Sequence, residues 1–259
     1  MHFLGVETKM KNIAIAIQKG GVGKTTVSLN LSAELAKTNK VLLIDADPQG
    51  NSTSTLITEI NYELADVLYG EVSVDKAICE TPIKNLSILP TAALDEKNSN
   101  KLKNYRSKEA SDNPFAFVEI TDILKDMGFD YCIFDTSPSF DAFEENIMQA
   151  CDEAVAVVMP DMYSLNGLEI FDANLKSFKK RKHVNNPVFK TFVFNAVNLS
   201  KAMDKEILKQ LKEKSERECV VIPQDQNIRK SQVKLQTIQQ FGARTETFQA
   251  FKNLAEQVK

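Results

Sequence analysis

The chain has 259 residues, of which 43% are hydrophobic, and a formal net charge of -3. Its length suits one large α/β domain or two small ones, and its apolar content is enough for a buried core. No apolar run reaches membrane-spanning length and no signal-peptide pattern opens the chain, so we expect a cytoplasmic protein with no membrane partner. The negative charge gives no global attraction to nucleic acid, so DNA binding would need a local basic patch.

The four cysteines, Cys79, Cys132, Cys151 and Cys219, are scattered without CxxC spacing. Cys132 lies within an apolar run, where a buried thiol is favoured over a disulfide or a metal ligand. With two histidines and no Cys/His cluster, a structural zinc site is disfavoured. This cysteine usage is typical of a reducing compartment.

A glycine-rich loop follows the first predicted strand. The strand is an apolar run, Ile13–Ile17, of the kind that lies buried in a parallel sheet. The loop, Gln18–Thr26, leads into apolar residues at helical spacing, namely Val27, Leu31 and Leu35. Strand, glycine loop and helix in this order are the context in which a P-loop is expected.

The residue types in this loop suit a chain of phosphates. Gly20, Gly21 and Gly23 let backbone N–H groups turn inward where a Cβ would obstruct them. Lys24 supplies a positive charge for the β- and γ-phosphates, and the Thr25 hydroxyl is suited to ligate Mg²⁺. The start of the following helix adds its dipole at the same place. A glycine turn with a chance lysine is disfavoured, because all of these features agree.

Two later apolar strands end in acidic residues. Val41–Ile44 is followed by Asp45 and Asp47, and the run from Tyr131 ends in Asp135. The carboxyl ends of parallel strands meet at the ligand crevice of an α/β sheet, so all three carboxylates are expected there. A solvated acidic turn is the alternative for the first pair.

The rest of the chain alternates helical and strand patterns. Residues 95–114 are polar and lysine-rich, and we expect a mobile excursion whose charges form a solvated face. Amphipathic helices are expected over Phe115–Met127 and Thr245–Val258. Further buried strands are expected at residues 86–90, 154–160, 189–195 and 220–223.

These patterns predict the fold class. We expect a single α/β domain over residues 10–259, with a mostly parallel twisted sheet, helices on both faces and the ligand at the C-terminal strand ends. Residues 1–9 carry no periodic pattern, and we expect a disordered extension there.

Two stretches together carry a resemblance to a known family. Residues 19–26, followed by Asp-Ala-Asp-Pro-Gln-Gly-Asn at 45–51, resemble the deviant Walker A ATPases, the ParA/MinD superfamily of P-loop NTPases. Lys19, near the start of the loop, is the mark of that family, and the Asp-Pro-Gln-Gly-Asn ending resembles its ParA (Soj) branch. One departure is Ser137, which stands where the family has the first of two prolines.

The resemblance implies ATP and Mg²⁺ as ligands and assigns roles to individual residues. Lys19, Lys24 and Asp47 are the implied catalytic residues: Lys19 would reach the partner's phosphates in a dimer, and Asp47 would orient the attacking water. Thr25, with Asp45 and Asp135 through bound water, would hold Mg²⁺. The implied nucleotide-binding residues are Lys19, Gly20, Gly21, Val22, Gly23, Lys24, Thr25, Thr26, Asn195, Pro223 and Asp225.

Two basic groups are candidates for DNA contacts. The first group follows the last predicted strand, and the second ends the helix that begins near Ser164, where a solvated helix end explains the charges equally well. The candidates are Arg229, Lys230 and Lys234 in the first group and Lys179, Lys180 and Arg181 in the second.

The resemblance implies a ParA-type ATPase for plasmid or chromosome partition. Such a protein hydrolyses ATP slowly, forms an ATP-dependent homodimer and binds double-stranded DNA without sequence preference, which would place it on the nucleoid. A ParB-like centromere-binding partner would stimulate hydrolysis and release it. The alternatives are a ParA-like positioner of protein cargo, which shares the same residues, and a MinD-like membrane switch, which is disfavoured because Gln257–Lys259 is no basic amphipathic tail.

Overall fold

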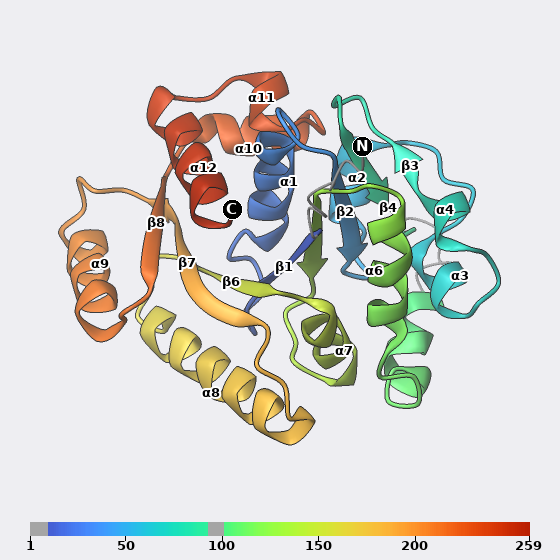
Figure 1. Ribbon diagram of the computed structural model, residues 1–259. Helices are drawn as coiled ribbons and strands as arrows, with labels where there is room; N and C mark the ends of the chain where they lie inside the picture. The colour runs from blue at the N-terminus through green and yellow to red at the C-terminus, as the bar shows by residue number, and fades with distance from the viewer. Residues whose placement is uncertain (1–9, 93–100) are drawn as a thin grey trace, which may run out of the picture.

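The computed structural model describes residues 10–92 and 101–259. An eight-stranded sheet forms the centre, in the order β3-β4-β2-β5-β1-β6-β7-β8, and every neighbouring pair is parallel except β3 and β4 (Figure 1). The strands are β1 (Lys11–Ala16), β2 (Val41–Ala46), β3 (Cys79–Glu80), β4 (Leu86–Leu89), β5 (Tyr131–Thr136), β6 (Glu153–Val158), β7 (Val188–Val197) and β8 (Glu218–Pro223).

Helices cover both faces of the sheet (Figure 1). One layer contains α1 and α12, which pack on each other, and the other contains α7 and α8. The helices are α1 (Lys24–Leu35), α2 (Asn51–Leu56), α3 (Leu64–Leu68), α4 (Val74–Ala77), the π-helix η1 (Tyr105–Glu109), α6 (Ala116–Asp126), α7 (Ala142–Ala150), α8 (Ser164–Lys182), α9 (Ala202–Lys214), α10 (Gln226–Val233), α11 (Ile238–Phe241) and α12 (Thr245–Gln257).

The apolar runs of the sequence form the middle of the sheet. Strands β2 and β6 are buried along their whole length, and β1 and β5 are buried after their first residue. Continuous apolar runs suit this position, because a parallel sheet with helices on both faces hides both sides of each strand. The expected α/β fold with a mostly parallel sheet is therefore confirmed.

Helix α1 is buried on nearly all sides rather than along one stripe. Besides Val27 and Leu31, its polar residues Ser28, Asn30 and Ser32 are buried. The side-chain amide of Asn30 donates to the Thr26 carbonyl at 2.8 Å, and its oxygen accepts the Ile238 backbone amide at 2.9 Å. The helix lies between the sheet and α11 and α12, and there Ser28 and Asn30 serve as internal hydrogen-bond partners.

The expectation of a mobile excursion over residues 95–114 is wrong for its described part. Residues 101–104 are helical and lead into η1, and Leu102, Tyr105 and Ala110 are buried. The Tyr105 ring packs edge-on to Tyr69 and Phe143, with centroid distances of 5.3 and 6.4 Å. The three buried side chains lie three and five residues apart among lysines and asparagines, a pattern too sparse to stand out as periodic.

The remaining predicted elements are present with shifted ends. The helices expected from Phe115 and Thr245 are α6 and α12, and the strands expected at residues 189–195 and 220–223 are longer in the structure. In the described part of the chain, no helix has both the length and the apolar composition to cross a membrane. The expectation for residues 1–9 lies outside the described residues.

Candidate functional site

The glycine loop turns directly into helix α1. Gly23, in the left-handed region with φ of 96°, is the N-cap of α1, and no side chain caps the helix end. The first amides of α1 are therefore available to a ligand, and the helix dipole favours an anion there. A Cβ on Gly23 would overlap the side-chain nitrogen of Asn195, so this position needs glycine for space as well as for conformation.

Lys24 lies at the bottom of this loop. Its side chain is 7% exposed, and its ammonium donates to the Lys19 carbonyl at 3.0 Å. Burial lowers the pKa of Lys24, and the nearby carboxylates, first Asp135 and then Asp47, act in the opposite direction. A buried cation that faces two carboxylates and open loop amides is suited to hold an anion with several charges.

Two carboxylates meet beneath the loop. Asp45 on β2 and Asp135 on β5 are neighbours in the strand register, and both are fully buried. One Asp45 oxygen accepts the Thr53 amide at 2.8 Å and the Thr53 hydroxyl at 2.7 Å, while Asp135 accepts hydroxyls from Ser28 at 3.1 Å and Ser52 at 2.7 Å. Burial raises the pKa of Asp135 to about 6, and burial together with Asp135 raises the pKa of Asp45 well above its usual range.

These residues fit a magnesium ion. The other oxygen of Asp45, Oδ1, is buried and has no hydrogen-bond partner, although an ionised carboxylate needs a cation or donors at both oxygens. The Thr25 hydroxyl contacts Asp135, which puts a third oxygen ligand beside the pair. Among the described residues, no group of three or more His, Cys, Asp or Glu is placed to hold a metal ion by itself. Mg²⁺ does not need such a group, because it commonly binds through one or two carboxylates plus phosphates and water.

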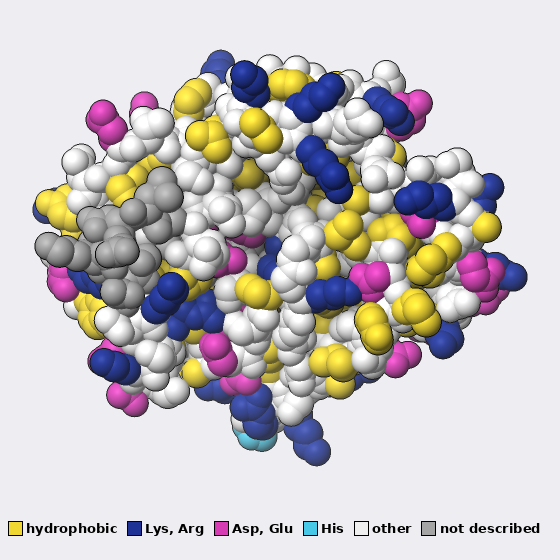
Figure 2. All heavy atoms as spheres, turned by 180° about the vertical axis from the view of Figure 1, so that it is seen from behind, with side chains coloured by type: hydrophobic (Ala, Val, Ile, Leu, Met, Phe, Trp, Pro, Cys, Tyr) yellow, Lys and Arg dark blue, Asp and Glu magenta, His cyan; other side chains and the backbone are white. Residues whose placement is uncertain are grey.

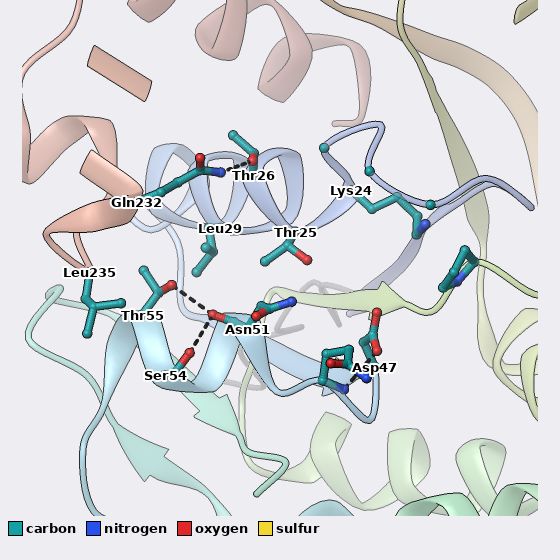
Figure 3. A pocket seen from close by; sticks show the side chains of 15 residues that line it. Lys24, Thr25, Thr26, Leu29, Asp47, Asn51, Ser54, Thr55, Gln232 and Leu235 are labelled. Carbon is teal, nitrogen blue, oxygen red and sulfur yellow. Dashed lines mark hydrogen bonds between the residues drawn. The ribbon is translucent and has the colours of Figure 1, made fainter. Parts of the chain in front are cut away.

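A cavity of about 610 Å³ opens above these residues, and we call it the P-loop cavity. Figure 3 shows that α1 and α2 face each other across it, with Lys24, Thr25 and Thr26 on one side and Asp47 and Asn51 on the other. Asp47 is held by a turn in which its carboxylate accepts the Gln49 amide at 2.9 Å. In Figure 3 the Asp47 carboxylate lies toward the Lys24 end of the cavity.

A second cavity of about 320 Å³, the Asn195 cavity, lies on the other side of the loop. Its lining includes Asn195, Pro223 and Asp225, the three residues assigned to nucleotide binding outside the loop. Asn195 is 6% exposed and donates from its amide to the Val22 carbonyl at 2.9 Å. The Asp225 carboxylate accepts hydrogen bonds from residues 227, 244 and 247, so it ties α10 to the start of α12 at the edge of this cavity.

Gln232 on α10 joins the two cavities. It lines both of them, together with Gly21, Gly23 and Thr26. Its side-chain amide donates to the Thr26 hydroxyl at 2.7 Å, a contact drawn in Figure 3. The two cavities share these lining residues and are therefore neighbouring parts of one cleft around the loop.

Lys19 is held by its own chain. Its ammonium pairs with Asp161 in the loop between β6 and α8 and lies 6.0 Å from the centre of the Tyr163 ring. Both partners of this ion pair are about one third exposed, and a pair exposed to this degree contributes roughly 0–1 kcal/mol. The contact is weak enough for Lys19 to change partners when another anion approaches.

The two basic groups lie at opposite ends of the strands. Arg229, Lys230 and Lys234 are exposed and follow the C-terminal end of β8, on the side of the sheet where the strands end and the cleft lies. The second group ends α8, which runs back to the start of β7, and there Lys179 donates to the Pro187 carbonyl and Arg181 pairs with Glu145. Figure 1 shows α10 at the top of the molecule and α8 at the bottom, and in Figure 2 Lys and Arg side chains occur at both the upper and the lower rim.

Several residues of the site were not identified from the sequence. Ser28, Ser52 and Thr53 complete the carboxylate pair, and Asp161 and Gln232 hold Lys19 and Thr26. Ser28 is four residues after Lys24 and so shares its helix face, which was a usable signal. The others come from segments whose approach to the loop depends on the tertiary fold.

Comparison with known proteins identifies relatives of this chain. A family profile described as an AAA domain matches residues 10–190. An uncharacterized protein of Borreliella burgdorferi is 37% identical over 182 residues, covering 67% of this chain and 72% of the relative. The sporulation initiation inhibitor protein Soj of Bacillus subtilis is 37% identical over 162 residues, covering 61% of this chain and 62% of Soj, which is less than two thirds of its length.

Solved structures share the fold over almost the whole chain. The septum site-determining protein MinD of Pyrococcus horikoshii, solved in complex with Mg-ADP, superposes with a TM-score of 0.78 and 25% identity, over 96% of each chain. The similarity therefore extends beyond the region that the family profile matches and includes the C-terminal third, which supplies Asn195, Pro223 and Asp225 to the Asn195 cavity.

Proposed function

The chain belongs to the ParA/MinD family of P-loop ATPases, and on this premise we propose that it is a ParA-type ATPase that partitions plasmid or chromosomal DNA. In this proposal, ATP binding produces a homodimer that binds DNA without sequence preference. A ParB-like centromere-binding partner stimulates hydrolysis, which releases the protein from the nucleoid. The observation that carries the proposal is the cleft around the glycine loop, with its buried carboxylate pair at one end.

The phosphate end would be the P-loop cavity. The amides at the start of α1 and the Lys24 ammonium would bind the β- and γ-phosphates, and Thr25, Asp45 and Asp135 would hold Mg²⁺. When bound, Mg²⁺ neutralises charge on the phosphates. Asp47 would orient the attacking water, since it lies at the Lys24 end of the cavity and is fixed by its own turn.

Lys19 would act in the partner subunit of the dimer. Its pairing with Asp161 keeps it at the rim of the cleft, where both groups are about one third exposed. A lysine that reaches a second subunit's phosphates would supply positive charge only after dimerisation, so hydrolysis would be slow in the monomer. Lys19→Ala is accordingly expected to bind ATP and to remain monomeric.

DNA binding would involve α10. Arg229, Lys230 and Lys234 are exposed there, and the bond from Gln232 to Thr26 links the same helix to the loop. A ligand that displaces the Thr26 hydroxyl from this bond would free α10 to move. Each phosphate neutralised adds about 0.9 to the slope of log affinity against log salt, so a dimer with two such helices binds far more strongly than a monomer. The group at the end of α8 lies at the opposite end of the strands, where Arg181 is already paired, and contributes less.

The experiment that tests this function follows mass and DNA binding together. The mass of the protein is measured with ADP and with ATP, and each form is then titrated with random duplex DNA over a range of salt concentrations. We expect an ATP-dependent dimer, DNA binding by that form only, and a shallower salt slope for Arg229→Ala/Lys230→Ala. Absence of ATP hydrolysis contradicts the ATPase. Hydrolysis and dimerisation without DNA binding at low salt favour protein cargo instead.

A further inference from the structure

An arginine outside the glycine loop and the strand ends holds the segment that follows Asp135. Arg106 lies in η1, and its side chain is 12% exposed. Its guanidinium donates to the hydroxyls of Ser137 at 2.8 Å and Ser139 at 2.7 Å. The same group lies 2.9 and 3.0 Å from the two carboxylate oxygens of Glu144, so one side chain connects three points of residues 137–144.

Arg106 is itself fixed by its surroundings. Its guanidinium carbon lies 4.7 Å from the centre of the Phe143 ring, and Asp141 approaches to 3.3 Å. The preceding residue, Tyr105, packs edge-on to Phe143 from the same helix turn. A planar guanidinium held between an aromatic face and a carboxylate loses little further freedom when it binds the two hydroxyls.

Glu144 needs this arginine. The carboxyl group is fully buried and accepts the Ser137 hydroxyl at 2.7 Å, and Arg106 and Asp141 are its hydrogen-bonded charged neighbours, with Lys24 as a further nearby charge. Burial, and next the hydrogen bond with Asp141, raise the pKa of Glu144 to about 7. Without Arg106, Glu144 would lose its nearest counter-charge while it stays buried beside Asp141, and removal of one partner from a buried pair is destabilising.

The segment held in this way contributes Pro138 to the wall of the P-loop cavity. Thr136 anchors its start by donating to the Ile15 carbonyl at 2.9 Å, and Pro138 lines the cavity together with Thr25 and Asp47. The hydroxyls of Ser137 and Ser139 flank Pro138 and are directed to Arg106. Arg106 therefore acts on the wall from outside the cavity and does not line it.

We propose that Arg106 is a positioning residue for hydrolysis: through Ser137, Ser139 and Glu144 it holds residues 136–141 against α7, and so keeps Pro138 in the cavity wall that also contains Asp47 and Thr25. This inference rests on the proposed ATPase function. Displacement of a wall by about 1 Å is enough to lower a rate by up to 100-fold when the reacting groups must be aligned. Ser137 serves this contact directly, because the proline that the family has at this position offers no hydroxyl.

The test compares two arginines with similar surroundings. Arg217 also pairs with a carboxylate, Asp172, and lies 4.2 Å from the centre of an aromatic ring, Phe189, but it precedes β8 at the edge of the sheet away from the cleft. We expect Arg106→Gln to lower kcat about 10-fold with KM for ATP changed by less than about 2-fold, because the loop amides and Lys24 are untouched. Arg217→Gln should lower Tm comparably and leave kcat unchanged.

A conservative variant adds a second readout. Arg106→Lys keeps a charge beside Glu144 but loses the fork that reaches both hydroxyls, so it should recover part of kcat. Should Arg106→Gln fail to fold, Ser139→Ala leaves the arginine in place and removes only the hydroxyl that contacts Arg106 and Ser137, so it is expected to lower kcat about 2- to 3-fold. An unchanged kcat in Arg106→Gln, or an equal fall in Arg217→Gln, overturns the positioning role.

Amide hydrogen exchange separates this inference from the proposed function. In the nucleotide-free protein, residues 136–141 should exchange faster in Arg106→Gln than in the wild type, whether or not the protein hydrolyses ATP. A wild type without ATPase activity contradicts the proposed function, while unchanged exchange of this segment in Arg106→Gln contradicts the hold by Arg106 itself.

Discussion

The two ends of the cleft are built in different ways. The P-loop cavity is lined mainly by residues from two short stretches, 20–29 and 47–55, that follow β1 and β2. The Asn195 cavity shares Gly21, Gly23 and Thr26 with it, and its other residues come mainly from the ends of β6, β7 and β8 and from α10, which are far apart in the sequence. The phosphate end therefore depends on local motifs, and the other end depends on the relative placement of distant elements. The predictions below test this difference, beginning with the largest expected effect.

Lys24→Ala should abolish nucleotide binding at the phosphate end. The variant removes a buried ammonium that faces the loop, and charge-assisted hydrogen bonds contribute roughly 1.5–3 kcal/mol each, so we expect affinity for ADP to fall by about 100-fold or more. Titration calorimetry measures this change. Lys37→Ala is the control, since Lys37 is exposed just after the other end of α1 and pairs with Glu34 there. Retained affinity in Lys24→Ala contradicts the assignment of this cavity to phosphates.

Asp47→Ala should separate hydrolysis from binding at the same end. The substitution removes the group assigned to the attacking water and leaves the loop and the carboxylate pair in place, so we expect kcat to fall by about 100-fold with little change in ATP affinity. Single-turnover hydrolysis and a binding titration give the two quantities. Turnover at the wild-type rate would remove Asp47 from the mechanism.

Gly23→Ala should disturb the junction of the two ends. The new Cβ would overlap the Asn195 amide, and Gly23 has a φ of 96°, so we expect a loss of about 1–3 kcal/mol in the free energy of unfolding. Urea denaturation measures it. Gly167→Ala in α8 is the control, because nothing lies within 4 Å of its Cβ position and its φ is not left-handed. Equal stability of Gly23→Ala and the wild type contradicts the tight approach of Asn195.

The smallest expected effect is on the pH dependence of stability in the absence of Mg²⁺. The pKa of Asp135 in the folded state, about 6, lies above its value in the unfolded chain, so the folded protein binds the extra proton between about pH 4 and 6. Stability therefore falls as pH rises through this window, in contrast to a carboxylate stabilised by a cation. We expect the Tm of the wild type to fall relative to that of Asp135→Asn as pH rises from about 4 to 6. With Mg-ADP bound, we expect the wild type to gain Tm relative to the variant over the same range. A difference independent of pH contradicts the buried, uncompensated pair.

Much of the phosphate end could be predicted from the sequence. The loop, Lys24, Asp45 and Asp135 stand at the ends of apolar runs, and parallel strands bring such ends to one edge. The partners of these groups were harder to find. Ser52 and Thr53 are polar residues of a short helix, and nothing in their own spacing shows that they face the carboxylates of two different strands.

The sequence by itself determined the strand and helix order, the parallel sheet and the edge at which the ligand binds, because these follow from local apolar periodicity and from the conformations that glycine permits. Only the tertiary structure decided what the polar segments do. Residues 101–114 look like a solvated excursion in the sequence, yet they bury Tyr105 and direct Arg106 to Ser137 and Glu144. The physical reason is that burial of a charged side chain depends on counter-charges brought from elsewhere in the chain, and no local pattern records them.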